Sequence, residues 1–188
     1  GKVESFINHK IIESQNIDNG ILATCEMQVS DNKGNEGLQM TYETKCQNGK
    51  YYLNLENMFS ELTSQYKAQG MKISFENGIS VIPNNLRVGD ELEDATMIMT
   101  MTTGAMNMKM SITVSDKKVI GKETITTPAG TYDCLILTQN TTMTMGKLMN
   151  VTSKSKDWIS KGIGSVKSEN YDKNGKLDGY TLLTKFNK

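Results

Sequence analysis

The stretch Ala95-Thr96-Met97-Ile98-Met99-Thr100-Met101 carries methionine at every second position, and Met106-Asn107-Met108-Lys109-Met110 repeats the pattern after a short loop. Alternation with a period of two is typical of a β-strand, and two such segments joined by a turn predict a β-hairpin. One face of this hairpin is lined by methionine, and the other carries threonine, asparagine and lysine. Because methionine is unbranched and polarisable, a face lined with it can adapt to a partner of irregular shape.

Most of the remaining chain also consists of short alternating segments separated by Gly, Asn and Asp turns. One segment, Met58–Gln69, instead has apolar residues at helical spacing and is followed by Gly70, where a helix commonly ends. Ten or more antiparallel strands cannot lie flat in one twisted sheet. We therefore predict a single, mainly β domain over residues 1–188. It would be a curved antiparallel sheet, a half-barrel or a barrel, with one helix packed across it.

Composition narrows the function classes. The chain has 188 residues and equal numbers of basic and acidic residues, 21 of each. It lacks the basic stripe with interleaved aromatics that is typical of nucleic-acid binding. No apolar stretch approaches the roughly 20 residues needed to span a bilayer. Gly1 stands where an initiating Met would, which indicates either a removed targeting segment or a residue left by cloning.

The three cysteines are too far apart in sequence for a metal motif. With the polar turn 31–37 as centre, the segments Ile21–Ser30 and Leu38–Cys46 pair as a hairpin that sets Cys25 nearly opposite Cys46. Both cysteines fall on the inward face, and directly paired residues lie about 4.5–5.5 Å apart, within disulfide reach. Two hypotheses stay open, a Cys25–Cys46 disulfide and two small buried thiols. Cys134 is expected to be a buried free thiol.

Three strings in the chain resemble one family. They are Pro83–Asp90, Val119–Cys134 and Asp157–Glu169. Together they resemble the TapB-like family of envelope proteins from didermic bacteria, itself defined mainly as a domain of unknown function. The resemblance spans roughly residues 79–186. It implies export, usually with a lipid anchor upstream of Gly1, and a β-rich fold similar to periplasmic lipoprotein-carrier half-barrels. It implies no catalytic residues.

Other candidate sites have simpler interpretations. His9, the only histidine, lies in an alternating strand segment, so a solvated or hydrogen-bonded imidazole is favoured over a catalytic one. Trp158 is predicted to pack in the core near a bulge at Gly162 and Gly164, with a ligand anchor as the alternative. The acidic segment Asp90–Asp94 matches no calcium loop and is predicted to be a solvated turn. We therefore expect no enzyme, no catalytic residue and no cofactor.

The methionine pattern leaves three hypotheses open. The first is a methionine-rich core, because aromatics are scarce at 6% of residues. The second is an apolar ligand or partner groove. The third is Cu(I) binding by thioethers, since soft sulfur ligands select Cu(I).

From these hypotheses we predict an exported, non-enzymatic protein that binds a lipid-like or hydrophobic ligand in the periplasm or at the outer membrane. An envelope-assembly subunit without a small ligand is the alternative. The predicted ligand-binding residues are six hairpin methionines and three helix residues that would form a lid: Met97, Met99, Met101, Met106, Met108, Met110, Phe59, Leu62 and Tyr66.

Overall fold

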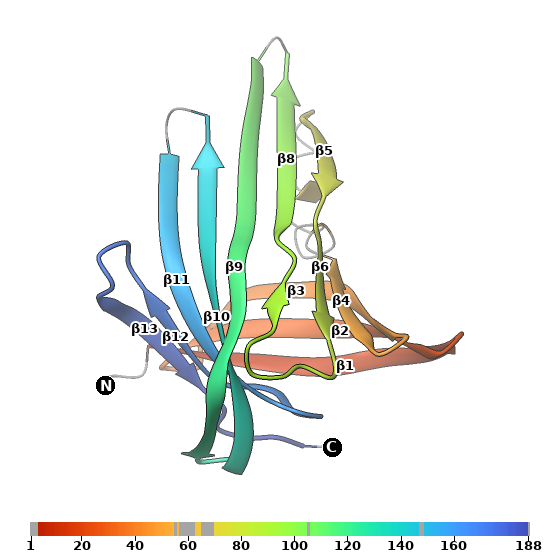
Figure 1. Cartoon of the computed structure of the whole chain (residues 1–188). Helices are drawn as coiled ribbons and strands as arrows, with labels where there is room; N and C mark the ends of the chain where they lie inside the picture. The colour runs from red at the N-terminus through yellow and green to blue at the C-terminus, as the bar shows by residue number, and fades with distance from the viewer. Residues whose placement is uncertain are drawn as a thin grey trace. The chain divides into compact units, whose positions relative to one another are not determined.

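The computed structural model describes residues 4–54, 56, 63–64, 70–104, 106–146 and 149–187. Regular structure in these residues is almost entirely β-strand (Figure 1). In chain order the strands are β1 (Ser5–Ile17), β2 (Gly20–Asp31), β3 (Glu36–Gln47), β4 (Lys50–Asn54), β5 (Lys72–Asn77), β6 (Ile79–Pro83), β7 (Glu91–Leu92), β8 (Ala95–Thr103), β9 (Met106–Thr127), β10 (Gly130–Met145), β11 (Met149–Ser160), β12 (Gly164–Tyr171) and β13 (Leu177–Leu182). The predicted mainly β fold is confirmed.

Within the described residues the strands form two sheets. The five-stranded sheet has the order β1-β2-β3-β4-β6, and the eight-stranded sheet has the order β13-β12-β11-β10-β9-β8-β5, with β7 paired to β9. Neighbouring strands in the five-stranded sheet, and from β9 to β13, pair in antiparallel fashion. Each order has two free ends, so neither sheet closes on itself. Of the predicted alternatives, the structure has the open, curved sheet rather than the closed barrel.

The chain divides into two compact units. The first unit comprises Gly1–Pro83 and Met99–Asn107, and the second comprises Asn84–Ile98 and Met108–Lys188. The five-stranded sheet therefore belongs entirely to the first unit, whereas β8 and β9 each contribute residues to both. The prediction that residues 1–188 behave as one domain stays a prediction.

An Asn-Gly pair fixes the hairpin between β3 and β4. Asn48 and Gly49 have φ angles of 50° and 73°, and two consecutive left-handed residues are the requirement of a type I′ turn, which matches the twist of the flanking strands. The same pair at Asn77-Gly78 also predicts a tight hairpin turn, and this prediction is wrong. Asn77 and Gly78 do have positive φ angles, 62° and 101°, but β5 lies next to β8 and β6 next to β4, so the chain passes here from one sheet to the other.

Two other hairpins are closed by an aspartate side chain. Asp31 Oδ1 accepts hydrogen bonds from the backbone N–H of Lys33 and of Asn35 at 2.8 and 2.9 Å. The Asp172 carboxylate does the same for Asn174 and Lys176 at 2.8 and 2.9 Å. These side-chain bonds add to backbone bonds in the same turns, from Gly34 N–H to the Asp31 carbonyl at 3.1 Å and from Gly175 N–H to the Asp172 carbonyl at 2.9 Å. The second of these turns joins β12 to β13.

The core of the second unit lies on β10 and its neighbours. Cys134, Ile136, Trp158 and Val166 form a buried cluster. Leu137, which follows Ile136 and points to the opposite face of β10, is also buried. This part of β10 is therefore covered on both faces, and the prediction that Trp158 packs in the core is confirmed. Cys134 is a buried free thiol, as predicted, and burial raises its pKa.

The predicted bulge beside Trp158 is also present. The pairing register between β11 and β12 shifts between Trp158 and Ile159. Gly162 and Gly164, in the turn that joins these strands, have φ angles of 77° and 100°. Positive φ values favour glycine because it lacks a Cβ atom. The chain can therefore reverse within a few residues and leave the indole over the sheet.

Candidate functional site

Burial of the hairpin methionines changes along β8 and β9. Met97 and Met99 are buried, with exposed fractions of 0% and 5%, whereas Met106 and Met108 are exposed at 73% and 41%. Two half-buried methionines complete the set, Met101 and Met110. The core hypothesis requires the burial seen at Met97 and Met99, and a binding surface requires the exposure seen at Met106 and Met108. That any of the six contacts a ligand stays a prediction.

The opposite face of this hairpin is polar, as the alternation predicts. Thr96 and Thr113 share a hydrogen bond between their hydroxyl groups at 3.2 Å. Near the hairpin loop, the hydroxyl of Thr102 donates to Asn107 Oδ1 at 2.6 Å. Pairs of this kind stabilise neighbouring strands on a solvated face.

The three predicted lid residues, Phe59, Leu62 and Tyr66, lie outside the described residues. Of the predicted helix Met58–Gln69, the structure describes Thr63 and Ser64, and both are helical. No helix in the described parts of the chain is long and apolar enough to cross a bilayer.

The predicted Cys25–Cys46 pairing is wrong. Cys25 of β2 lies opposite Tyr42. Cys46 lies opposite Ile21, which precedes Cys25 by four residues on β2. At about 3.3 Å per residue, four positions separate the two cysteines by about 13 Å, beyond the roughly 7 Å that a disulfide can bridge. Both thiols are free; Cys25 is buried and Cys46 is exposed. The turn 31–37 has its centre at Gly34, which places Cys25 opposite Glu43, one position from its observed partner Tyr42. A pairing of Cys25 with Cys46 therefore does not follow from that centre.

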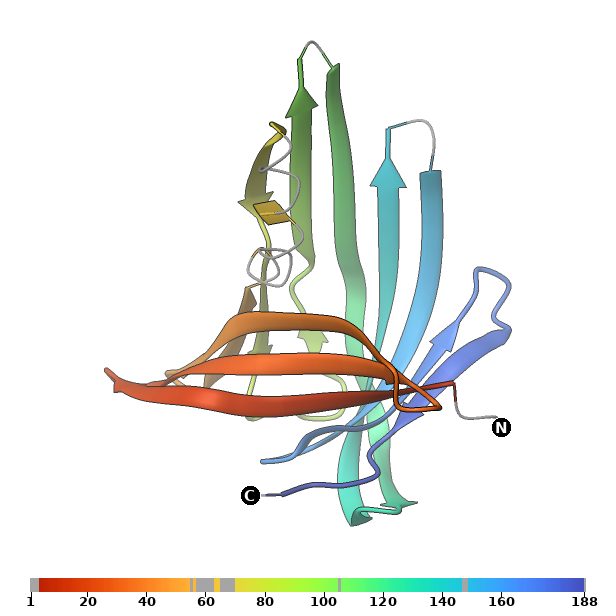
Figure 2. The ribbon, with the colours of Figure 1, turned by 180° about the vertical axis from the view of Figure 1, so that it is seen from behind.

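The five-stranded sheet has one apolar and one polar face. Its strands β1, β2 and β3 lie side by side as long, curved ribbons (Figure 2). Register places one set of side chains together on the apolar face: Ile7, His9 and Ile11 of β1, Ala23, Cys25, Met27 and Val29 of β2, and Met40 and Tyr42 of β3. The polar face includes Glu26 and Gln39, which are joined by a hydrogen bond of 3.0 Å. This face also carries Lys45, whose ammonium lies 4.7 Å from the ring centroid of Tyr52.

The apolar face is only partly covered. Ala23 and Cys25 at its centre are buried, but Ile7, Ile11 and Ile21 have exposed fractions of 46%, 65% and 48%. Isolated exposed apolar residues are ordinary, whereas a contiguous group on one face marks an interaction surface. This face is therefore the candidate functional site of the first unit.

One hydrogen-bonded group of polar side chains lies within the apolar face. The Tyr42 hydroxyl lies 3.2 Å from His9 Nδ1, and the two rings meet edge to face with centroids 6.4 Å apart. The same hydroxyl is hydrogen-bonded to the Cys25 thiol. Tyr42 therefore reaches from β3 across β2 to a residue of β1. His9 is hydrogen-bonded, which is one of the two states favoured from its sequence context.

Burial keeps these three groups uncharged near neutral pH. Desolvation raises the pKa of Tyr42 to about 12, with smaller contributions from Cys25 and Tyr51. Burial likewise raises the pKa of the Cys25 thiol and lowers the pKa of His9. Desolvation always disfavours the charged form, so all three shifts point toward neutrality. The apolar face therefore carries no charge at the place where these three polar side chains lie.

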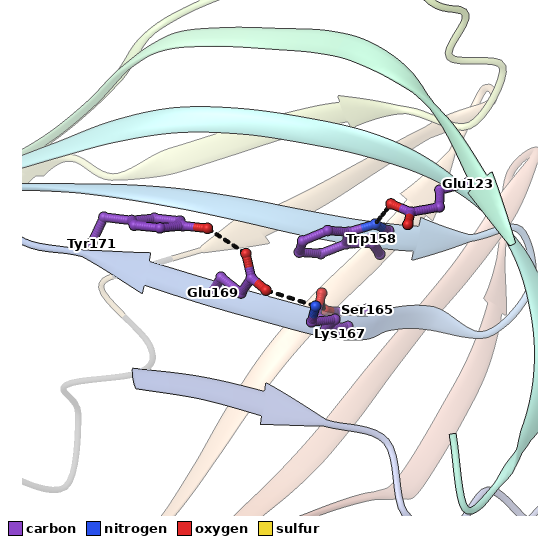
Figure 3. A network of polar contacts seen from close by, with 6 residues as sticks. All are labelled: Glu123, Trp158, Ser165, Lys167, Glu169 and Tyr171. Carbon is purple, nitrogen blue, oxygen red and sulfur yellow. Dashed lines mark hydrogen bonds and ion pairs between the residues drawn. The ribbon is translucent and has the colours of Figure 1, made fainter. Parts of the chain in front are cut away.

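A second polar network surrounds Trp158 in the second unit (Figure 3). The indole N–H donates to Glu123 Oε2 at 2.7 Å, and the ammonium groups of Lys156 and Lys167 each lie 4.3 Å from the ring centroid. Lys167 also pairs with Glu169 at 2.6 Å, and Tyr171 donates to the same carboxylate.

Burial opposes ionisation of Glu169, but the bonds from Lys167 and Tyr171 outweigh it and lower the pKa of this carboxyl. Trp158 is 2% exposed, and its only donor already has an acceptor. The network thus stabilises the core, and the indole N–H is already used in a hydrogen bond within the protein.

The acidic segment Asp90–Asp94 is occupied by contacts within the protein. The Asp90 carboxylate accepts from the backbone N–H of Arg87 at 2.7 Å, Glu91 pairs with Lys118 at 2.7 Å, and Asp94 accepts from the backbone N–H of Asp116 at 3.3 Å. Among the described residues, no group of three or more His, Cys, Asp and Glu side chains is placed to hold a metal ion.

The sequence was also compared with models of known protein families. The family model described as DUF3108-like matches residues 1–183, nearly the whole chain. The chain belongs to the DUF3108-like family. The narrower resemblance to TapB-like proteins stays a prediction. Among curated proteins none matches this DUF3108-like chain.

Two solved structures share the fold of this DUF3108-like chain. One is a predicted lipoprotein from Parabacteroides distasonis, with a TM-score of 0.75 and 23% sequence identity over 98% of this chain and 88% of that one. The other is a predicted exported protein with a YmcC-like fold from Bacteroides fragilis, with a TM-score of 0.73 and 18% identity over 100% and 90%. At these identities the likeness shows the fold alone.

Part of the apolar face of the five-stranded sheet can be identified from the sequence alone. Alternation places Cys25 and Met27, and separately Met40 and Tyr42, on inward faces of their strands. It does not bring His9 to them, because that juxtaposition depends on the β1–β2 register, in which His9 lies opposite Met27. The signal that was available is the alternation around His9 itself, with Ile7 and Ile11 on the same side.

Proposed function

We propose that this chain is a non-enzymatic, exported binding protein that takes up an apolar chain on the apolar face of its five-stranded sheet. The observation that carries the proposal is the asymmetry of that sheet. One face joins isoleucine, methionine and neutral polar groups and is partly open, whereas the other carries charged and amide side chains.

The chemistry of the face suits a flexible, lipid-like ligand. Met27 and Met40 lie directly opposite each other on β2 and β3, and thioether side chains adapt to irregular guests. Removal of apolar area from water provides about 25 cal/mol per Å², before the cost of ordering the ligand. Met106 and Met108 offer a further exposed apolar surface for which the same ligand chemistry is proposed.

Two similarities support our proposal that the protein is exported. The two structural neighbours are described as a predicted lipoprotein and a predicted exported protein, and the TapB-like resemblance implies the same location. We place the protein in the periplasm or at the outer membrane of a didermic bacterium, with a lipid anchor upstream of Gly1.

A second candidate function is an interaction subunit of an envelope assembly. The observation that favours it is β1, an edge strand of 13 residues with exposed Phe6, Ile7, Ile11 and Ile12. An exposed apolar edge is a template for a strand from another protein.

A matched pair of variants tests the ligand-binding proposal. Ile7 lies on the apolar face and the adjacent Asn8 on the opposite one, so Ile7→Glu and Asn8→Glu add the same charge on different faces. Binding of a fluorescent fatty-acid analogue should weaken at least about 10-fold, or 1.4 kcal/mol, in Ile7→Glu only. Equal effects of the two changes would contradict the proposal.

Native mass spectrometry of protein from an envelope fraction separates the two candidates. An extractable apolar adduct supports ligand binding, and a stoichiometric partner protein supports the assembly subunit. Loss of the adduct in Met106→Glu and Met108→Glu, but not in Ile7→Glu, would move the site to the methionine hairpin.

A further inference from the structure

The apolar face of the first unit concentrates soft metal ligands. His9 of β1 lies opposite Met27 of β2, and Met27 lies opposite Met40 of β3. Cys25 precedes Met27 by two residues and therefore points to the same face. Directly opposed side chains have Cβ atoms about 4.5–5.5 Å apart, and diagonal neighbours are about 7–8 Å apart. A thiol, two thioethers and an imidazole thus lie within reach of one point above β2.

Two of these donors already converge. His9 Nδ1 lies 3.2 Å from the Tyr42 hydroxyl, and the Cys25 thiol is hydrogen-bonded to the same oxygen. The nitrogen and the sulfur are thus both neighbours of one oxygen atom. Met27 lies opposite His9 and shares a strand face with Cys25.

We propose that these four side chains bind one Cu(I) ion: His9, Cys25, Met27 and Met40. Thiolate and thioether ligands select soft cations, and imidazole also suits copper. Carboxylates, which suit Mg²⁺ and Ca²⁺, are absent from this part of the face, where β2 carries Ala23, Cys25, Met27 and Val29. The proposal differs from a thioether site on the methionine hairpin, because the hairpin supplies neither thiol nor imidazole.

The binding step is balanced without any redox partner. Binding of Cu(I) by the Cys25 thiol forms a Cu–S bond, breaks the S–H bond and releases one proton to solvent, with no change in oxidation state.

The test is an anaerobic titration of the full chain with Cu(I) against a chromogenic Cu(I) chelator. We expect one Cu(I) per chain and release of one proton per ion at neutral pH. Cys25→Ser should weaken binding by at least about 100-fold, the upper range for loss of a supporting group. His9→Ala and Met27→Leu should weaken it in the same direction. Cys134→Ser, which removes a buried thiol in the second unit, should leave binding unchanged.

Three outcomes would overturn the proposal: absence of competition with the chelator, retention of affinity in Cys25→Ser, or equal loss in Cys134→Ser. Circular dichroism of each variant separates loss of ligand from loss of fold, and Met27→Leu, which nearly conserves volume, keeps the test valid if Cys25→Ser unfolds. The inference does not rest on the proposed function, because the probe is the metal alone. Failure of fatty-acid binding in Ile7→Glu would leave the Cu(I) result unaffected.

Discussion

Tyr42 links three strands through its hydroxyl, and its ionisation should therefore affect stability. The pKa of Tyr42 is raised to about 12 from an ordinary value of 10.0. Below pH 10 both the folded and unfolded chains keep the proton, so Tyr42 adds no pH dependence. Between pH 10 and 12 the unfolded chain loses the proton first, and the free energy of unfolding falls as pH rises.

Tyr42→Phe should remove this contribution. Urea unfolding of both proteins from pH 8 to 12 measures the difference in their free energies of unfolding. That difference should be constant up to pH 10 and then shrink as the wild type loses stability. Parallel curves throughout would show that the Tyr42 pKa is not raised. Tyr132→Phe is a suitable comparison, because Tyr132 lies in the second unit and its hydroxyl bonds the Ala129 carbonyl.

The Glu123 carboxylate should contribute measurably to the free energy of unfolding. It accepts the indole N–H of Trp158, and a buried donor without an acceptor costs about 1–3 kcal/mol. Glu123→Leu should therefore lower the free energy of unfolding by that amount. Glu123→Gln retains an oxygen acceptor and should lose much less. Fluorescence of Trp158, the only tryptophan, reports unfolding of both variants in guanidinium; equal losses would contradict a role for this hydrogen bond.

At the scale of elements, the β2–β3 register makes a chemical prediction. Wild-type protein should contain no Cys25–Cys46 linkage, because the two residues are four positions out of register. Ile21 lies directly opposite Cys46, and both are exposed. Ile21→Cys should therefore form a disulfide with Cys46 under mild oxidation. Leu22→Cys, on the other face, should not. Non-reducing peptide mapping distinguishes the two, and a Cys25–Cys46 peptide would refute the register.

Along the methionine hairpin, identical substitutions should have unequal costs. Met97 is fully buried and Met106 is largely exposed. Met97→Ala should lower the free energy of unfolding by about 2–5 kcal/mol, because it leaves a cavity. Met106→Ala should change it by less than about 0.5 kcal/mol. Urea denaturation measures both. A large cost at Met106 would show that the exposed end of the hairpin is structural.

These elements show where sequence is sufficient and where it is not. Asn48-Gly49 defines the β3–β4 hairpin because few other pairs accept two left-handed residues. The same pair at Asn77-Gly78 makes no hairpin, because β5 and β6 pair with strands of different sheets. The Asp31 turn spans several residues and has no such two-residue signature, so the sequence leaves the β2–β3 register open. Alternation likewise predicts which face Met97 and Met106 share. It cannot predict their different burial, which depends on the strands that pack around each end. The site on the five-stranded sheet requires register between β1 and β2, which sequence leaves open.

At the scale of the molecule, the hairpin strands connect the two compact units covalently. Met99–Asn107 belongs to the first unit, although the residues on both sides of it belong to the second. Unfolding of either unit therefore releases one end of both β8 and β9, which are also neighbours in one sheet. Sharing of continuous strands favours a single cooperative transition. We therefore expect residues 1–188 to unfold as one cooperative unit.

The three free cysteines allow this coupling to be measured without mutation. Cys25 is buried in the first unit, Cys134 is buried in the second, and Cys46 is exposed. In a urea series with brief alkylation, Cys46 should react at every concentration. Cys25 and Cys134 should become reactive at one common midpoint, which should coincide with the change in Trp158 fluorescence. Exposure of Cys25 at lower urea than Cys134 would mean that the first unit opens independently, because a buried thiol reacts only after its own surroundings unfold.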